Sequence, residues 1–174
     1  AISSAPVAAF GFLGSTPGAI TVQGAQLAVS EGQGISLVGG NITVQGGTLA
    51  QATVQPARLS APGGQITLVS VGSPGEVSAT GIENQPLEPF VNGFSRFGTI
   101  SLSQGTTIDT SATKAGRIII RGGQFTMDDA SLKSITGNGH GMVTEGETAS
   151  PAISITSETI ALNNGTLITA DTHG

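Results

Sequence analysis

The feature that most constrains the fold of this chain is an internal repeat. Residues 19–27 read AITVQGAQL and residues 41–49 read NITVQGGTL, 22 positions later. Both contain the kernel Ile-x-Val/Leu, in which apolar and polar residues alternate, so the apolar side chains lie on one face of a strand. Looser copies of this kernel, most of them one or two residues after a Gly or Ala, occur at residues 66–68, 100–102, 118–120 and 153–155.

A shorter period lies inside this repeat. Apolar residues at strand centres are spaced by seven or eight in three runs: Ile20, Leu27, Ile35, Ile42 and Leu49; Ile118, Phe125 and Leu132; Ile153, Ile160 and Leu167. Each segment offers a few strand residues and then a turn, in which Gly, Asn, Ser or Asp supplies the tight backbone. Three such segments make one unit of about 21 or 22 residues.

These short, regularly spaced strands predict an all-β fold, namely a right-handed parallel β-helix with three sides. In such a solenoid each strand hydrogen-bonds to its equivalents one coil above and below, and the inward positions are apolar. The alternative is an antiparallel sandwich, whose hairpins need longer alternating runs joined by turns such as Asn-Gly. With the kernels as anchors, we predict about six coils of roughly 22 residues, beginning near residues 20, 42, 66, 100, 118 and 153.

The coil spacing predicts a single β-helix domain over residues 1–174 with two loop excursions. These are expected at residues 82–97 and 137–151, where the interval between kernels lengthens, and both are expected along one edge of the stack. Residues 1–18 are predicted to cap or extend the first coil, and residues 19–174 to form the coils. Because the chain begins with Ala and lacks a basic first segment, we interpret it as an internal or processed piece of a larger protein.

Composition excludes several functional classes. The chain has 6 Lys and Arg against 11 Asp and Glu, a net charge of −5, and no basic cluster of the kind a nucleic-acid binder needs to displace counterions. It has no Cys, which excludes disulfides, thiolate zinc sites and a Cys nucleophile. The uncharged stretch before Glu31 contains Pro6, Pro17 and several glycines, so it would make a poor membrane-spanning helix. We therefore expect neither a nucleic-acid partner nor membrane insertion.

Four runs of the sequence resemble a known family. They are FGFLGSTPGAITVQGAQLAVSEGQGISLVGGNITVQGGTL (10–49), LSAPGGQITLVSVGSPGEV (59–77), GTISLSQGTTIDTS (98–111) and AGRIIIRGGQFTMDDASLKSITGNGHG (115–141). In order and content they resemble bacterial filamentous haemagglutinin-type exoproteins. The resemblance implies two-partner secretion through an outer-membrane transporter, a β-helical shaft, and a secreted or cell-surface location. The family's amino-terminal secretion-signal module, with its Asn-Pro-Asn-Gly-type motif, has no match here, so the chain resembles the shaft downstream of that module.

The acidic residues do not form a catalytic pattern. Glycoside hydrolysis needs two carboxyl groups at a defined separation, and the only adjacent pair, Asp128-Asp129, follows a short strand and is predicted to form a turn. Asp109 and Asp171 are predicted to face outward, about three coils apart. Calcium-binding G-G-x-G-x-D repeats and a G-x-S-x-G nucleophile motif are absent from the sequence. We predict a non-catalytic protein with no cofactor and no metal.

Two arginines are candidates for a contact patch. Arg117 and Arg121 are four residues apart on either side of residues 118–120, a spacing that places both on one side of a strand. We interpret them as a solvated, outward pair, and an anionic-sugar contact is the alternative.

The first excursion supplies the other candidates. It contains Phe90, Phe94, Arg96 and Phe97, and these three phenylalanines are half of the aromatic residues in the chain. We expect the phenylalanines to pack the loop onto the shaft. The alternative is a small adhesive or assembly contact.

These features predict a structural shaft segment of a secreted or cell-surface adhesin, with an unknown host, glycan or surface receptor. Two alternatives stay open: a self-assembling extracellular fibre subunit, with end-to-end or lateral self-association, and a carbohydrate-active β-helix protein of lyase or hydrolase type. An enzyme should show a cleft with convergent carboxylates, a fibre should stack coil on coil between chains, and a shaft should do neither. A secretion-signal module in the flanking sequence would favour the shaft.

Overall fold

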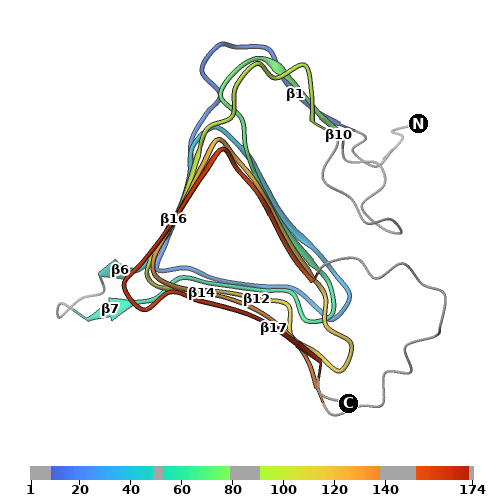
Figure 1. Cartoon of the computed structure of the whole chain (residues 1–174), viewed down its shortest axis with the longest axis vertical. Helices are drawn as coiled ribbons and strands as arrows, with labels where there is room; N and C mark the ends of the chain where they lie inside the picture. The colour runs from blue at the N-terminus through green and yellow to red at the C-terminus, as the bar shows by residue number, and fades with distance from the viewer. Residues whose placement is uncertain (1–8, 49–52, 79–90, 138–151, 173–174) are drawn as a thin grey trace, which may run out of the picture.

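The computed structural model describes residues 9–48, 53–78, 91–137 and 152–172. Within these ranges the chain is all-β and contains no helix, and hence no helical segment that could cross a membrane. Most of the strands pair in parallel, and Figure 1 shows that they line the three sides of a triangle. These parallel ladders confirm the all-β prediction, and the alternative of an antiparallel sandwich is wrong.

We number the three sides as faces. The first face contains β2 (Ile20–Gln23), β5 (Ile42–Gln45), the first halves of β12 (Thr99–Asp109) and β14 (Gln124–Thr136), and β16 (Thr159–Asn163). The second face contains β3 (Gln26–Ala28), β8 (Arg58–Ser60), the second halves of β12 and β14, and β17 (Leu167–Thr172). The third face contains β4 (Ile35–Gly39), β9 (Gln65–Ser70), β13 (Arg117–Arg121) and β15 (Ile153–Thr156).

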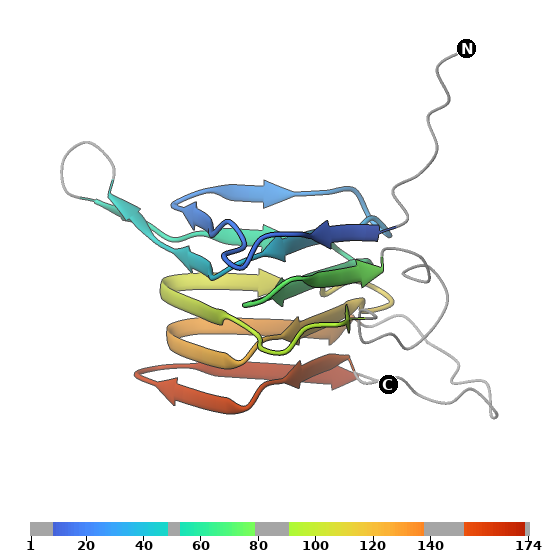
Figure 2. The ribbon, with the colours of Figure 1, turned by 90° about the horizontal axis from the view of Figure 1, so that it is seen from above.

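The chain visits these faces in the same order each time, and we call each round a level. The levels are β2-β3-β4, β5-β8-β9, β12-β13, β14-β15 and β16-β17, and Figure 2 shows them stacked from the blue to the red end. The pairing of the described strands gives five levels and not the predicted six. The prediction required the kernel to mark one position in every coil, but Ile42 pairs with Ile100 on the first face, whereas Ile66 pairs with Ile118 on the third.

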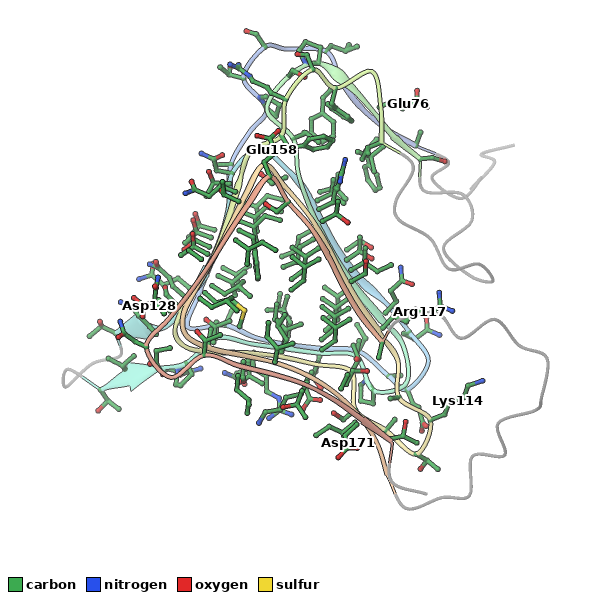
Figure 3. All side chains as sticks on the ribbon, viewed as in Figure 1. Glu76, Lys114, Arg117, Asp128, Glu158 and Asp171 are labelled. Carbon is green, nitrogen blue, oxygen red and sulfur yellow. The ribbon has the colours of Figure 1, made fainter. Side chains whose placement is uncertain are left out.

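The alternation of apolar and polar residues explains why the strands pack as they do. Inward residues form columns between register partners, and in the middle levels their side chains are fully buried: Ile42, Val44, Leu59, Ile66, Leu68, Ile100, Leu102, Ile108, Ile118, Phe125, Met127 and Leu132. Charged side chains lie outside the triangle, as Figure 3 shows for Glu76, Lys114, Arg117, Asp128, Glu158 and Asp171. One apolar core therefore runs through the first four levels.

Glycines before the third-face strands allow adjacent levels to approach closely. A Cβ atom on Gly64 would overlap the carbonyl oxygen of Gln33, and one on Gly116 would overlap that of Gly64. These three residues stack at the corner that precedes β4, β9 and β13. The tendency of kernels to follow a glycine thus has a steric cause, since a side chain at this corner would push the levels apart.

The corner between the first and second faces uses left-handed backbone in successive levels. Gln104, Asp129 and Asn164 have φ angles of 56°, 50° and 32° there. The predicted turn at Asp128-Asp129 is confirmed, and it lies inside the long strand β14 as a bend. Level 4 has one residue fewer at this corner than level 3, where the register shifts between Ser103 and Thr106.

A smaller antiparallel sheet lies beside the stack. It consists of β1 (Ala9–Phe12), β10 (Gly75–Ser78) and β11 (Val91–Asn92), in the order β1-β10-β11. It packs over a second apolar cluster that includes Val69, Val71 and Val77. Of residues 1–18, which were predicted to cap or extend the first coil, residues 9–12 pair with β10; residues 1–8 lie outside the described part.

A hairpin, β6 (Gly47–Thr48) with β7 (Val54–Gln55), interrupts the second level and was not predicted. The repeat placed Leu49 opposite Leu27, but the register partner of Leu27 is Leu59, after the hairpin. Leu167 was likewise predicted inward, yet the residue in register with the buried Leu132 is Ile168. In both cases the corner contains more residues than the seven-residue spacing allows.

The two predicted excursions do not share an edge. Residues 91–97, the described part of the first, lead into β12 on the first face, whereas the second separates β14, which ends on the second face, from β15 on the third. They therefore return at different corners, because the kernels that follow them lie on different faces. Residues 82–90 and 138–151 of these excursions lie outside the described residues.

Candidate contact surface

The aromatic residues of the first excursion pack against the chain itself. Phe94 lies between Phe12 and Phe97, with ring centroids 6.1 and 6.0 Å away and tilted ring planes. All three belong to the partly buried rim of the cluster around Val69 and Val71. Tilted pairs at this separation are a favourable aromatic geometry. Phe94 and Phe97 thus have the expected packing role, while Phe90 lies outside the described residues.

Arg121 joins this aromatic cluster to the main stack. It is the last residue of β13, and its guanidinium carbon lies 4.5 Å from the centroid of the Phe97 ring. Its Nε atom is buried and has no hydrogen-bond partner. The interpretation of Arg121 as half of a solvated pair is therefore wrong: the guanidinium stacks on an aromatic face, which is a cation–π contact.

Arg96 and Arg117 lie in different surroundings. The Arg96 side chain is exposed; its Nε donates to the carbonyl of Gly72 and its Nη2 donates to the carbonyl of Ser15 at 3.4 Å. It thereby links the excursion to two other segments of the chain. Arg117, at the start of β13, lies outside the triangle and away from the aromatic cluster (Figure 3). The structure thus brings together Phe94, Phe97 and Arg121, and leaves Arg117 apart.

The carboxylates are dispersed over the outer surface. Asp109 forms an ion pair with Arg58 of the level above at 2.9 Å. The Asp128 carboxylate accepts a hydrogen bond from Asn164 Nδ2 at 2.9 Å, one level below. Asp171 is in register with Ile135, not with Asp109. In the described ranges no group of three or more His, Asp or Glu residues could hold a metal ion.

One open hollow of about 250 Å³ lies at the corner between the first and second faces. It occupies the place where level 4 lacks a residue, between the loops at Gly105 and Gly165. Asp129 and Lys133 are its only charged lining residues, beside Thr106, Ala130, Ser131 and Leu167. A single carboxylate does not provide the acid and base pair that glycoside hydrolysis requires.

The most exposed apolar side chains of the stack's inward columns lie at its two ends. Leu27 is 37% exposed on β3, and the last level exposes Ile160, Leu162 and Ile168. The sequence alone could not identify these residues as exposed, because their alternating pattern is the same as that of buried columns. Only the order of the strands shows that, among the described residues, these side chains have a neighbouring level on one side and none on the other.

Comparisons with protein-family models, with curated proteins and with solved structures found no match to this chain.

Proposed function

We propose that the chain is a right-handed parallel β-helix that serves as a non-catalytic shaft segment of a secreted or cell-surface adhesin of filamentous haemagglutinin type. The observation that carries this proposal is the continuity of three parallel ladders around a single apolar core. β12 pairs with β5 and β8 of the level before it and with β14 of the level after it. β14 pairs in turn with β16 and β17 of the level that follows.

This construction suits a rigid spacer. Adjacent levels are one strand spacing apart, about 4.8 Å, so length grows in proportion to the number of levels. Most of the backbone hydrogen bonds of the stack run between levels, along the axis of the rod. Bending the rod would open one face, and the core columns shared by successive levels resist such opening.

The arrangement of charges supports a non-catalytic role. The described carboxylates belong to corners and outer faces, where Asp109 bonds to Arg58 and Asp128 bonds to Asn164. The hollow beside Asp129 is open and has a single carboxylate in its lining. These residues fit turn formation and cross-level bonding, which stabilise a shaft.

Export through an outer-membrane transporter agrees with the composition. The chain has no Cys and 10% charged residues. A polypeptide of this kind can pass a narrow β-barrel pore unfolded and then fold outside without forming disulfides. Its receptor, whether a host surface or a glycan, would be reached by loops of the shaft or by other modules.

The experiment that tests this function is an export assay. The chain is fused behind a two-partner secretion-signal module and expressed with or without the matching transporter. We expect protease-accessible, folded chain outside the cell only when the transporter is present. Chain that stays in the periplasm with the transporter present would contradict the proposal.

A parallel assay addresses the enzymatic alternative. The purified chain is incubated with acidic polysaccharides, and new reducing ends or unsaturated uronates are measured. We expect no product above that formed with heat-denatured chain, and product formation would favour the carbohydrate-active alternative.

A further inference from the structure

The hollow at the corner between the first and second faces arises from a shorter corner in level 4. Between the register positions of Asp128 and Ser131, levels 3 and 5 contain residues 104–106 and 164–166, whereas level 4 contains only residues 129–130. The corner of level 4 is therefore recessed between Gly105 above and Gly165 below, which both line the hollow. Both glycines have left-handed φ angles, 75° and 69°, and neither has a side chain that could cover the opening. Asp128 marks this corner in Figure 3.

Two charged side chains that line the hollow, those of Asp129 and Lys133, have no partner among the described residues. The nearby carboxylates differ in this respect, because Asp109 pairs with Arg58 and Asp128 accepts a hydrogen bond from a neighbouring level. Lys133 is half-buried, and Asp129 is exposed. Both charged groups are thus available to a ligand that enters the hollow.

The remaining lining residues add a hydroxyl group and apolar surface. The Ser131 hydroxyl donates its proton to a neighbouring threonine, so its oxygen can still accept a hydrogen bond. Ala130 and Leu167 contribute apolar side chains, and Leu167 is 51% exposed. The hollow therefore offers a strong acceptor at Asp129, a strong donor at Lys133 and an apolar wall. A sugar ring has the matching features, since its hydroxyls both donate and accept and its C–H groups are apolar.

The size and charge of the hollow restrict the ligand further. Its volume is about 250 Å³, which corresponds to roughly eight waters at ~30 Å³ each. Pockets for drug-sized ligands start at about 300 Å³, so this hollow suits one sugar ring and not an oligosaccharide. Because one carboxylate and one ammonium group line it, an acidic sugar would be repelled by Asp129 and an amino sugar by Lys133.

From these features we propose that the hollow binds a single uncharged sugar residue, a hexopyranose at the end or on a branch of a glycan. Lys133 donates to the oxygen of one sugar hydroxyl, and the Asp129 carboxylate accepts from a neighbouring hydroxyl. Hydrogen bonds with one charged partner are about twice as strong as those between neutral groups. The open side of the hollow leaves the rest of the glycan in solvent. The inference rests on the proposed function, since it names the class of receptor and its place on the shaft.

A titration followed by two-dimensional amide NMR tests the site. The probes are the methyl glycosides of glucose, galactose and mannose. With at least one of them we expect saturable shifts of the Gly105, Ser131 and Gly165 amide signals, with a dissociation constant in the millimolar range. Asp129→Asn removes the charge and keeps a residue type that tolerates left-handed backbone, and Lys133→Met removes the donor. Each variant should weaken binding about tenfold, because a hydrogen bond to a charged group is lost.

Glu76→Gln is the matched control, because it removes an exposed carboxylate from β10, far from Asp128 in Figure 3, and should bind like the unmodified chain. Thermal unfolding checks that each variant folds, and Lys133→Met decides alone if Asp129→Asn does not. Unchanged affinity in the folded variants would overturn the proposal, as would shifts confined to residues away from the hollow. Glucuronate, glucosamine and glycine are titrated as charged probes, and binding of these without any methyl glycoside would also overturn it.

The result separates this site from the shaft function. A folded chain that is exported but binds no glycoside would remove the sugar site and leave the shaft standing. A chain that binds a glycoside in the hollow but is not exported would remove the shaft and keep the site.

Discussion

The guanidinium of Arg121 stacks on the ring of Phe97, 4.5 Å from its centroid. Arg121 belongs to β13 in the main stack, and Phe97 belongs to the segment that returns to it before β12. This contact therefore connects a strand of the main stack to the apolar cluster around Val69 and Val71. Contacts between a guanidinium and an aromatic face contribute about 0.5–2 kcal/mol, and more when the site is desolvated.

A double-mutant cycle should detect this contact. We expect Arg121→Met and Phe97→Leu, measured singly and together by urea unfolding, to show a coupling free energy of about 0.5–1 kcal/mol. Arg117→Met combined with Phe97→Leu is the matched control, because Arg117 lies at the other end of β13, and its coupling should be near zero. Equal coupling in both cycles would show that the ring has no specific bond to Arg121.

Because successive levels share one core, we expect the stability lost on truncating an inward side chain to depend strongly on its level. Ile100 and Ile160 lie in the same inward column on the first face, but Ile100 is fully buried and Ile160 is 50% exposed. Ile100→Ala should lower the free energy of unfolding by about 2–5 kcal/mol, and Ile160→Ala should cost less than half as much because half of its side chain already contacts water. Chemical unfolding measures both. Equal losses would contradict the difference in burial between the two side chains.

The glycine corner should not tolerate a methyl group. Gly116→Ala would place a Cβ against the carbonyl oxygen of Gly64 in the level above, and the other nearest atoms are also backbone atoms of Gly64. We expect a loss of about 2 kcal/mol or more, because only a shift of the backbone relieves the overlap. Gly14→Ala is the control, since a Cβ at Gly14 would meet no atom beyond its chain neighbours within 4 Å. A harmless Gly116→Ala would contradict the close stacking of levels at this corner.

The hairpin of the second level should be dispensable. Deleting residues 47–56 joins Gly46 to Ala57 and gives the second level the same corner length as the first, where Gly24 and Ala25 separate β2 from β3. The hydrogen bonds lost include those from Gln55 Nε2 to the Gly24 carbonyl and from Gln26 Nε2 to the Pro56 carbonyl. At about 1 kcal/mol each, they predict a loss near 2 kcal/mol. Loss of cooperative thermal unfolding would show that the hairpin is required for the fold.

The sequence predicts a single level better than it predicts the stack. The spacing of Ile20, Leu27, Ile35 and Ile42 identifies three faces correctly, because a short strand and a tight corner use about seven residues at every turn of the triangle. The spacing fails where a corner holds an insertion. The sequence after Gly46 resembles a strand, so the repeat predicts Leu49 at the position of Leu27. The hairpin moves this position to Leu59.

The number of levels could not be derived from the kernels. Ile-x-Val/Leu describes any strand with two inward residues, and it occurs on the first face at Ile42 and on the third face at Ile66. Which face a kernel occupies depends on its hydrogen-bond partners in other levels, 49 to 58 residues away in the middle of the chain. The contact between Arg121 and Phe97 was unpredictable for the same reason, because it depends on where the excursion returns.

Disulfide trapping of one in-register pair tests the parallel stack most directly. The side-chain hydroxyls of Thr107 and Ser131 lie 3.2 Å apart on neighbouring strands of the second face, and the chain has no Cys of its own. In the double variant Thr107→Cys/Ser131→Cys, two thiols in adjacent strands are within reach of a disulfide. Thr107→Cys/Thr126→Cys is the control, because Thr126 lies on the first face. The intact mass of each variant is measured after oxidation at low protein concentration. We expect near-complete intramolecular cross-linking in the first variant and little in the second. Free thiols in the first variant, or equal cross-linking in both, would contradict the stacked levels on which the shaft depends.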